Sequence, residues 1–165
     1  MKKVYVSWND VQRQVQELVR QMWADRWVPD YVVGITRGGL TPANLISQYL
    51  NVPMHTLKVS LRDDDTDCES NLWMQGDAVD SLNILIVDDI NDSGATLNWI
   101  QDDWGPEVDW GRNVRVAVLY DNEASDSIHT PDYSAESINK VSDPQWIVFP
   151  WEEWWRRWNP EEQHN

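Results

Sequence analysis

The stretch "LNILIVDDINDSGATLNWI", residues 82–100, decides the expected fold. It begins with a run of aliphatic residues that ends in two adjacent carboxylates, Asp88 and Asp89. A turn of small and polar residues follows at 92–96, and we expect a helix over residues 95–104. A short aliphatic run bounded by a turn is typical of a strand buried in a parallel sheet. The stretch therefore predicts a strand, a turn and the start of a helix.

Strand and helix patterns alternate on both sides of this stretch. Three further segments have strand patterns, namely "YVVGI" at 31–35, "MHTLKVSL" at 54–61 and "NVRVAVLYD" at 113–121. A helix should follow the first of them and end near Leu50, with Thr41 as its N-cap and Pro42 in its first turn. Strands that alternate with helices predict an α/β fold, in which helices cover both faces of a mostly parallel sheet.

The N-terminal segment predicts a helix that precedes the first strand. Ser7 and Asp10 have the spacing of a capping box, which marks a helix start. Apolar residues then recur at helical spacing, at Val11, Val15, Leu18, Val19 and Met22. These two signals together predict the first helix of the chain.

Length and composition exclude several classes of protein. The 165 residues suit one domain, and no apolar run approaches the roughly 18 residues of a membrane span, so we expect no membrane partner. The single cysteine, Cys68, excludes an internal disulfide framework and a cysteine zinc site, and it suits the reducing cytoplasm. A net charge of -15 would repel phosphate polymers, so we expect no nucleic acid partner.

The polar residues after the aliphatic run predict a ligand site. In open parallel sheets, ligands bind beyond the carboxyl ends of the strands, where we expect Asp88 and Asp89. The turn at 92–96 offers backbone N–H groups and two hydroxyls at a helix N-terminus, which favours a phosphate. Carboxylates beside a phosphate require a cation such as Mg²⁺, or hydroxyl groups, between them. The alternative is that the two carboxylates only cap the helix and face water.

Three segments together resemble one enzyme family. "ILIVDDINDSGATL" resembles the phosphoribosyl pyrophosphate (PRPP) signature of type I phosphoribosyltransferases. "YVVGITRGGLTPANLISQYLNVP" resembles the segment of xanthine-guanine and hypoxanthine phosphoribosyltransferases that carries their pyrophosphate loop, and "WIVFPWE" resembles the purine-site segment of the bacterial xanthine-guanine enzymes. The resemblance covers most of residues 4–152.

The resemblance implies roles for individual residues in binding PRPP. Arg37, Gly38 and Gly39 match the pyrophosphate loop, although "RGG" also suits an ordinary turn between strand and helix. Asp88 and Asp89 match the acidic pair that holds the ribose hydroxyls and Mg²⁺, with Asp89 as the main metal contact. The following residues match the rest of the PRPP and nucleotide site, namely Asn91, Asp92, Ser93, Gly94, Ala95 and Thr96.

Within that segment, Ser93 to Thr96 match the cradle for the 5′-phosphate, and Asp92 matches the catalytic residue that handles the proton near purine N7. Gly94→Val is expected to block the phosphate and leave the fold intact. Trp146 matches the aromatic residue that stacks on the base, and Ile147 matches the neighbour whose backbone contacts the exocyclic groups of the base.

The chain departs from the family pattern at three places. Relatives carry a lysine for the purine 6-oxygen shortly after the strand at 113–121, where this chain has "DNE". We expect Asn122 to donate to the base instead, whereas an ionised Asp121 in the base site would favour a base with an amino group. No basic residue lies between Arg62 and Arg112, where relatives place a cation on pyrophosphate, so either Lys58 or Arg62 substitutes for it or PRPP binding is weak.

The remaining departure is the Trp-rich end at 151–165, which would cover the base site, form a subunit contact, or be a solvated helix. Residues 62–78 have no clear periodicity and are expected to form a mobile loop. This loop would either close over the site and exclude water or be a disordered surface insertion.

We therefore expect a single type I phosphoribosyltransferase domain over residues 1–165, with a small hood built from segments near 1–8 and 122–165. The expected activity is Mg²⁺-dependent transfer of 5-phosphoribose from PRPP to guanine, xanthine or hypoxanthine, in a cytoplasmic homo-oligomer that is a dimer or a tetramer. Two alternatives are a PRPP- or nucleotide-sensing regulator without activity, and a phosphoribosyltransferase for another base.

Overall fold

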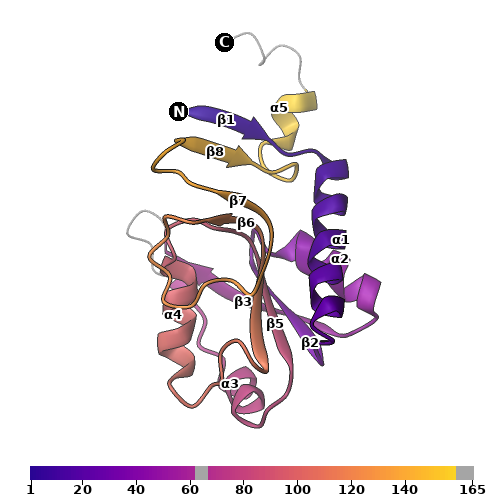
Figure 1. The fold of residues 1–165 in the computed structure, drawn as a ribbon, viewed down its shortest axis with the longest axis vertical. Coiled ribbons are helices and arrows are strands. Elements are labelled where there is room, and N and C mark those ends of the chain that lie inside the picture. The colour runs from indigo at the N-terminus through magenta and orange to yellow at the C-terminus, as the bar shows by residue number, and fades with distance from the viewer. Residues whose placement is uncertain (62–66, 159–165) are drawn as a thin grey trace.

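The computed structural model describes residues 1–61 and 67–158, and a six-stranded sheet forms its centre (Figure 1). The strand order is β4-β3-β2-β5-β6-β7, and every neighbouring pair is parallel except β3 with β4. The strands are β2 (Tyr31–Thr36), β3 (Met54–Ser60), β4 (Asp67–Cys68), β5 (Ile84–Asn91), β6 (Val114–Asn122) and β7 (Tyr133–Ile138). The prediction of a mostly parallel sheet is confirmed.

Helices cover both faces of this sheet, as expected. The first face packs against α1 (Trp8–Ala24) and α2 (Leu40–Leu50), and the second packs against α3 (Leu72–Val79) and α4 (Ala95–Trp104) (Figure 1). Each face has its own apolar cluster, because alternate residues of a strand point to opposite sides of the sheet. Leu85 and Val87 lie in the first cluster, and Ile84 and Ile86 lie in the second.

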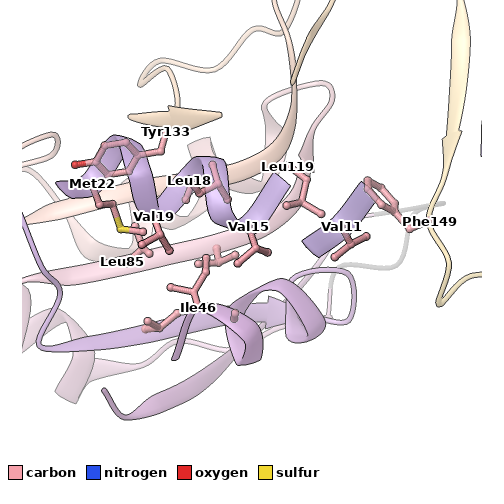
Figure 2. Close-up of a cluster of buried hydrophobic side chains, with 14 of the residues drawn as sticks. Val11, Val15, Leu18, Val19, Met22, Ile46, Leu85, Leu119, Tyr133 and Phe149 are labelled. Atoms are coloured by element: carbon pink, nitrogen blue, oxygen red, sulfur yellow. The ribbon is translucent and has the colours of Figure 1, made fainter. Parts of the chain in front are cut away.

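Helix α1 begins at the predicted capping box. The Ser7 hydroxyl accepts a hydrogen bond from the Asp10 backbone N–H at 3.0 Å, and the Asp10 carboxylate accepts one from the Ser7 N–H at 2.9 Å. Figure 2 shows the apolar face of the helix directed at Leu85, Leu119 and Ile46. All five residues of its predicted apolar stripe are buried. A buried side chain of the size of leucine contributes about 1.5–3 kcal/mol, so this face anchors the helix.

A hood forms from the two ends of the described chain. β1 (Lys2–Tyr5) pairs in parallel with β8 (Gln145–Val148), outside the main sheet, and α5 (Trp154–Trp158) follows (Figure 1). Phe149 is buried and lies beside Val11 of α1 in Figure 2, which connects the hood to the first core cluster. Trp151 stacks on Phe149 with a centroid distance of 4.9 Å. The expected hood of terminal segments is therefore present, but its second part is shorter than the expected 122–165, because residues 133–138 join the main sheet as β7.

Helix α3 corrects the expectation of an irregular loop over residues 62–78. Residues 72–79 form a helix that Asn71 caps, since the Asn71 side-chain oxygen accepts a hydrogen bond from the Met74 N–H at 3.1 Å. Only Met74 and Ala78 of this helix are buried, so its apolar pattern was too short to predict it. The first part of the expected loop, residues 62–66, lies outside the described residues.

Two smaller features also differ from expectation. Helix α2 begins at Leu40 with Gly39 as its N-cap, so the assignment of Thr41 as the cap was wrong. Strand β7 was not predicted, because only its first residue, Tyr133, is fully buried. In the part of the chain that the structure describes, no helix has both the length and the apolar character needed to cross a bilayer.

Candidate active site

The strand order places a ligand site between β2 and β5. From β2 the chain moves outward to β3 on one side, and it returns to build β5, β6 and β7 on the other side. The loops after β2 and β5 therefore diverge, and such a switch point leaves a crevice where ligands bind in open parallel sheets. The loop after β2 carries Arg37, Gly38 and Gly39, and the end of β5 carries Asp88 and Asp89. The sheet thus brings together the two motifs that the sequence singled out.

The glycines after β2 allow these two motifs to touch. A side chain at Gly38 would overlap the carboxylate of Asp89, and one at Gly39 would overlap the carbonyl oxygen of Val87. Packing alone therefore requires glycine at both positions, whether or not a ligand binds. Arg37 precedes them and is exposed.

The carboxylates of Asp88 and Asp89 differ in burial. Asp89 is only 6% exposed, whereas Asp88 is partly exposed. The Asp88 carboxylate accepts a hydrogen bond from the Asp89 N–H at 2.9 Å, and the Asp89 carboxylate accepts one from the Ile90 N–H at 2.8 Å. Each bond uses one oxygen of its carboxylate and fixes the side chain against the backbone.

Asp88 and Asp89 could bind a metal ion only together with other ligands. No group of three or more His, Cys, Asp or Glu side chains suited to a metal occurs within residues 1–61 and 67–158. A site made only of protein ligands is therefore not formed by these residues. Mg²⁺ commonly binds through one or two carboxylates together with substrate phosphates, and adjacent Asp88 and Asp89 fit that arrangement.

The N-terminus of α4 forms the candidate phosphate cradle. Gly94 precedes the helix with a φ of 91°, a left-handed conformation that favours glycine. Ser93 and Ala95 are exposed and Thr96 is partly exposed, so backbone N–H groups and hydroxyls are accessible at this end. The Ser93 hydroxyl accepts a weak hydrogen bond from the Ala95 N–H at 3.3 Å. These donors suit an anion at a helix start.

Gly94 also packs against the loop after β6, which corrects one expectation. A Cβ atom at Gly94 would overlap the backbone nitrogen of Ser127 and lie 2.8 Å from its Cα atom. The Asp126 N–H donates to the Ser93 carbonyl oxygen at 2.9 Å, which holds this loop in place. A substitution such as Gly94→Val would therefore disturb the fold, and the expectation that it leaves the fold intact was wrong.

Gly94→Ala should lower the free energy of unfolding by about 1–3 kcal/mol, because alanine is strained at this φ and its methyl group meets the backbone of Ser127. Gly76→Ala is the matched control, since a Cβ atom at Gly76 in α3 has open space around it. That variant should be as stable as the wild type or gain up to about 1 kcal/mol. Urea denaturation measures both. Equal stability of the two variants would contradict the tight packing at Gly94.

Asp92, Lys140 and Trp146 converge on the other side of the cradle. The Lys140 ammonium donates to the Asp92 carboxylate at 2.9 Å and lies 5.5 Å from the centre of the Trp146 ring. Trp146 of β8 is 45% exposed, while its neighbour Ile147 is buried. An acceptor from the turn after β5, a cation from the segment after β7 and a partly exposed aromatic ring from the hood therefore lie close together.

Lys140 is the functional candidate that the sequence analysis missed. Its only signal in the sequence is that it is the single lysine after Lys58. It lies beyond β7, a strand that was not predicted, so its approach to Asp92 had no local sign.

Asn122 holds Asp92 and Lys140 in place. Its side-chain amide donates to the Asp92 carbonyl oxygen at 2.9 Å, and its side-chain oxygen accepts from the Lys140 backbone N–H at 3.0 Å. Asn122 is buried, so the structure gives it an internal positioning role. Its expected contact with the base stays a prediction.

Asp121 and Asn91 form a second internal pair. The Asn91 amide donates to the Asp121 carboxylate at 2.8 Å, and both residues are buried. The same amide contacts the hydroxyls of Ser125 and Ser127 at 3.0 and 3.2 Å. Asp121 is thus engaged with Asn91, and Asn91 anchors the loop that covers Gly94.

The structure describes only some of the residues that were expected to contact pyrophosphate or to form the Trp-rich end. The Lys58 ammonium pairs with Asp67 of β4, and Arg62 lies outside the described residues. Trp154 and Trp155 of α5 are exposed. The three roles expected for this end, namely covering the base site, contacting a subunit or forming a solvated helix, all stay predictions.

Comparison with known proteins identifies the family of the chain. The model of the phosphoribosyl transferase domain family matches residues 5–156. Over 160 residues, the chain is 30% identical to xanthine-guanine phosphoribosyltransferase of Cereibacter sphaeroides, covering 92% of this chain and 87% of that protein. It is 24% identical to xanthine phosphoribosyltransferase 1 of Saccharomyces cerevisiae, covering 91% of this chain and 90% of that protein.

Among solved structures, purine phosphoribosyltransferase from Pyrococcus horikoshii superposes with a TM-score of 0.70 at 26% identity, covering 93% of this chain and 96% of that one. The family model spans the sheet, the loops after β2 and β5, and the hood strand that carries Trp146. The chain therefore belongs to the phosphoribosyltransferase family, and it is an enzyme of that type.

Proposed function

We propose that this enzyme transfers 5-phosphoribose from PRPP to a 6-oxopurine base, giving the nucleoside monophosphate and pyrophosphate. The observation that supports this most is the meeting of Asp92, Lys140 and Trp146 beside the cradle of α4. Two relatives named for xanthine, or for xanthine and guanine, support the class of base.

Different residues of the site bind PRPP and the purine base. The N-terminus of α4 holds the 5′-phosphate, and Asp88 and Asp89 accept hydrogen bonds from the ribose hydroxyls. Mg²⁺, when bound beside these carboxylates, neutralises charge on the leaving pyrophosphate. The base stacks on the exposed face of Trp146, with its N7 toward Asp92.

The reaction exchanges one bond at the anomeric carbon. The bond to pyrophosphate breaks, and N9 of the base forms the new bond. Asp92 accepts the proton that N7 loses, which leaves the base neutral in the product. The two carboxylates near the ribose stabilise positive charge that develops on the sugar in the transition state.

A competition among bases tests the proposal. Guanine, hypoxanthine, xanthine and adenine are supplied together with PRPP and Mg²⁺, and the nucleoside monophosphates are quantified. We expect products from the oxopurines to exceed those from adenine. Adenine as the preferred base would contradict the proposed substrate class. Absence of any product, together with tight binding of PRPP, would instead support a sensor.

Thr96→Ala should weaken binding of guanosine monophosphate by about 1–3 kcal/mol, since it removes a hydroxyl donor to a charged phosphate. Thr96 is partly exposed at the first turn of α4, so the thermal midpoint should stay unchanged. Thr130→Ala, at an exposed position in the loop before β7, is the matched control. Titration calorimetry measures the affinities. Equal affinities for both variants would contradict the cradle.

The remaining expectations concern assembly and location. A homo-oligomer stays a prediction, which light scattering of the purified protein checks. Cytoplasmic location also stays a prediction.

A further inference from the structure

We infer that Lys140 recognises the 6-oxygen of the base and sets the preference for oxopurines over adenine. This inference rests on the proposed function and names the residue that selects its substrate class. Lys140 follows β7, whereas the resemblance implied a lysine after β6, where this chain has "DNE". The donor would therefore enter the base site from a different strand.

The pairing of Asp92 with Lys140 matches one edge of a purine. Their charged atoms lie 2.9 Å apart, so they present an acceptor and a donor side by side. On a purine, N7 and the 6-substituent are also neighbours on one edge. A base that brings a proton on N7 and an oxygen at position 6 satisfies both groups. Adenine presents an amino group at position 6, and an ammonium has no lone pair to accept from it.

The surroundings of Lys140 fix this geometry. Its side chain is 17% exposed, its ammonium lies over the face of Trp146, and its backbone N–H is bound by the buried side chain of Asn122. Asn122 also binds the backbone of Asp92, so one amide sets the positions of both charged residues. A base stacked on Trp146 would therefore place its edge against a prearranged pair.

Lys2, on the hood strand β1, forms an exposed ion pair that can be compared with that of Lys140. Lys2 of β1 pairs with Asp143 at 3.2 Å, and both side chains are 58% exposed. Within residues 1–61 and 67–158, the ammonium of Lys2 makes no cation–π contact, unlike that of Lys140. Lys2→Met thus removes the same charge and the same donor from the hood without touching the base site.

The experiment compares wild type, Lys140→Met, Lys140→Arg and Lys2→Met. The ratio of kcat/KM for guanine to that for adenine is measured with saturating PRPP and Mg²⁺. Calorimetry gives the affinities for guanosine and adenosine monophosphates in parallel, a readout that needs no turnover. Thermal denaturation shows that each variant is folded.

We expect Lys140→Met to lower the ratio of kcat/KM for guanine to that for adenine on the order of 10- to 100-fold. The 6-oxygen of guanine loses its hydrogen-bond donor, and the 6-amino group of adenine no longer faces an ammonium that cannot accept from it. Lys140→Arg keeps a donor and should restore most of the ratio, and Lys2→Met should match the wild type. An unchanged ratio in Lys140→Met would overturn the inference while the proposed function stands.

The calorimetric measurements distinguish failure of the proposed function from failure of the inference about Lys140. If no base is turned over, the proposed function fails, yet a guanosine preference that disappears only in Lys140→Met would still support the role of Lys140. If Lys140→Met is unfolded, Lys140→Gln replaces it. An equal nucleotide preference in wild type and in the folded variant would overturn the inference.

Discussion

Asp92→Asn is expected to lower kcat about 10²- to 10⁴-fold, the range typical of a general base. Asparagine keeps the shape of the side chain but cannot accept the proton that N7 releases. The hydrogen bond from Asn122 to the Asp92 backbone does not involve the carboxylate, so the fold around position 92 should persist. Steady-state kinetics with guanine and saturating PRPP measure the change.

Asp102→Asn is the matched control for this prediction. Asp102 lies on α4, the helix that follows Asp92 in the chain, and is exposed, so its replacement removes an equal charge near the C-terminal end of that helix. It should leave kcat at the wild-type value. A kcat in Asp92→Asn that equals the control would show that the proton leaves by another route.

Simultaneous Asp88→Asn and Asp89→Asn should reduce the affinity for PRPP on the order of 100-fold or more when Mg²⁺ is present. Each carboxylate lost removes a charged acceptor worth about 1.5–3 kcal/mol, which is roughly 10- to 100-fold in affinity. The variant should also lose most of the Mg²⁺ dependence that the wild type shows. Calorimetry of both proteins, each with and without Mg²⁺, gives the four affinities.

A double variant at exposed carboxylates controls for net charge. Asp102→Asn with Asp109→Asn removes the same two charges, and both residues lie away from the loops after β2 and β5. Its affinity for PRPP should equal that of the wild type under both conditions. Mg²⁺ dependence that survives loss of Asp88 and Asp89 would place the metal elsewhere.

The elements predicted correctly are those whose signals are local in the sequence. Helix α1 carries its own cap at Ser7 and a long apolar stripe, and the buried strands are continuous aliphatic runs. Helix α4 occupies the predicted residues because a glycine lies at each end, Gly94 and Gly105. Helix α3 escaped prediction because its stability depends on burying Met74 and Ala78 against distant residues.

The same distinction applies to the site. The carboxylates Asp88, Asp89 and Asp92 follow an aliphatic strand, so their place at the sheet edge was predictable from the chain itself. Lys140 reaches Asp92 only because β7 pairs with β6, a relation between distant segments. The direction of the Asn122 side chain likewise depends on that pairing, so its hydrogen bonds to the backbone of Asp92 and Lys140 had no local sign in the sequence, and its contact with the base stays a prediction.

The pairing of β1 with β8 has a consequence for the order in which the enzyme forms during synthesis. The strand that β1 needs emerges from the ribosome only after the whole six-stranded sheet has been made. The sheet and the loops after β2 and β5 can therefore assemble first, whereas Trp146 is held in place only when β8 closes onto β1. Because contacts between such distant residues form slowly, a nascent chain should complete the loops after β2 and β5 before it fixes the position of Trp146.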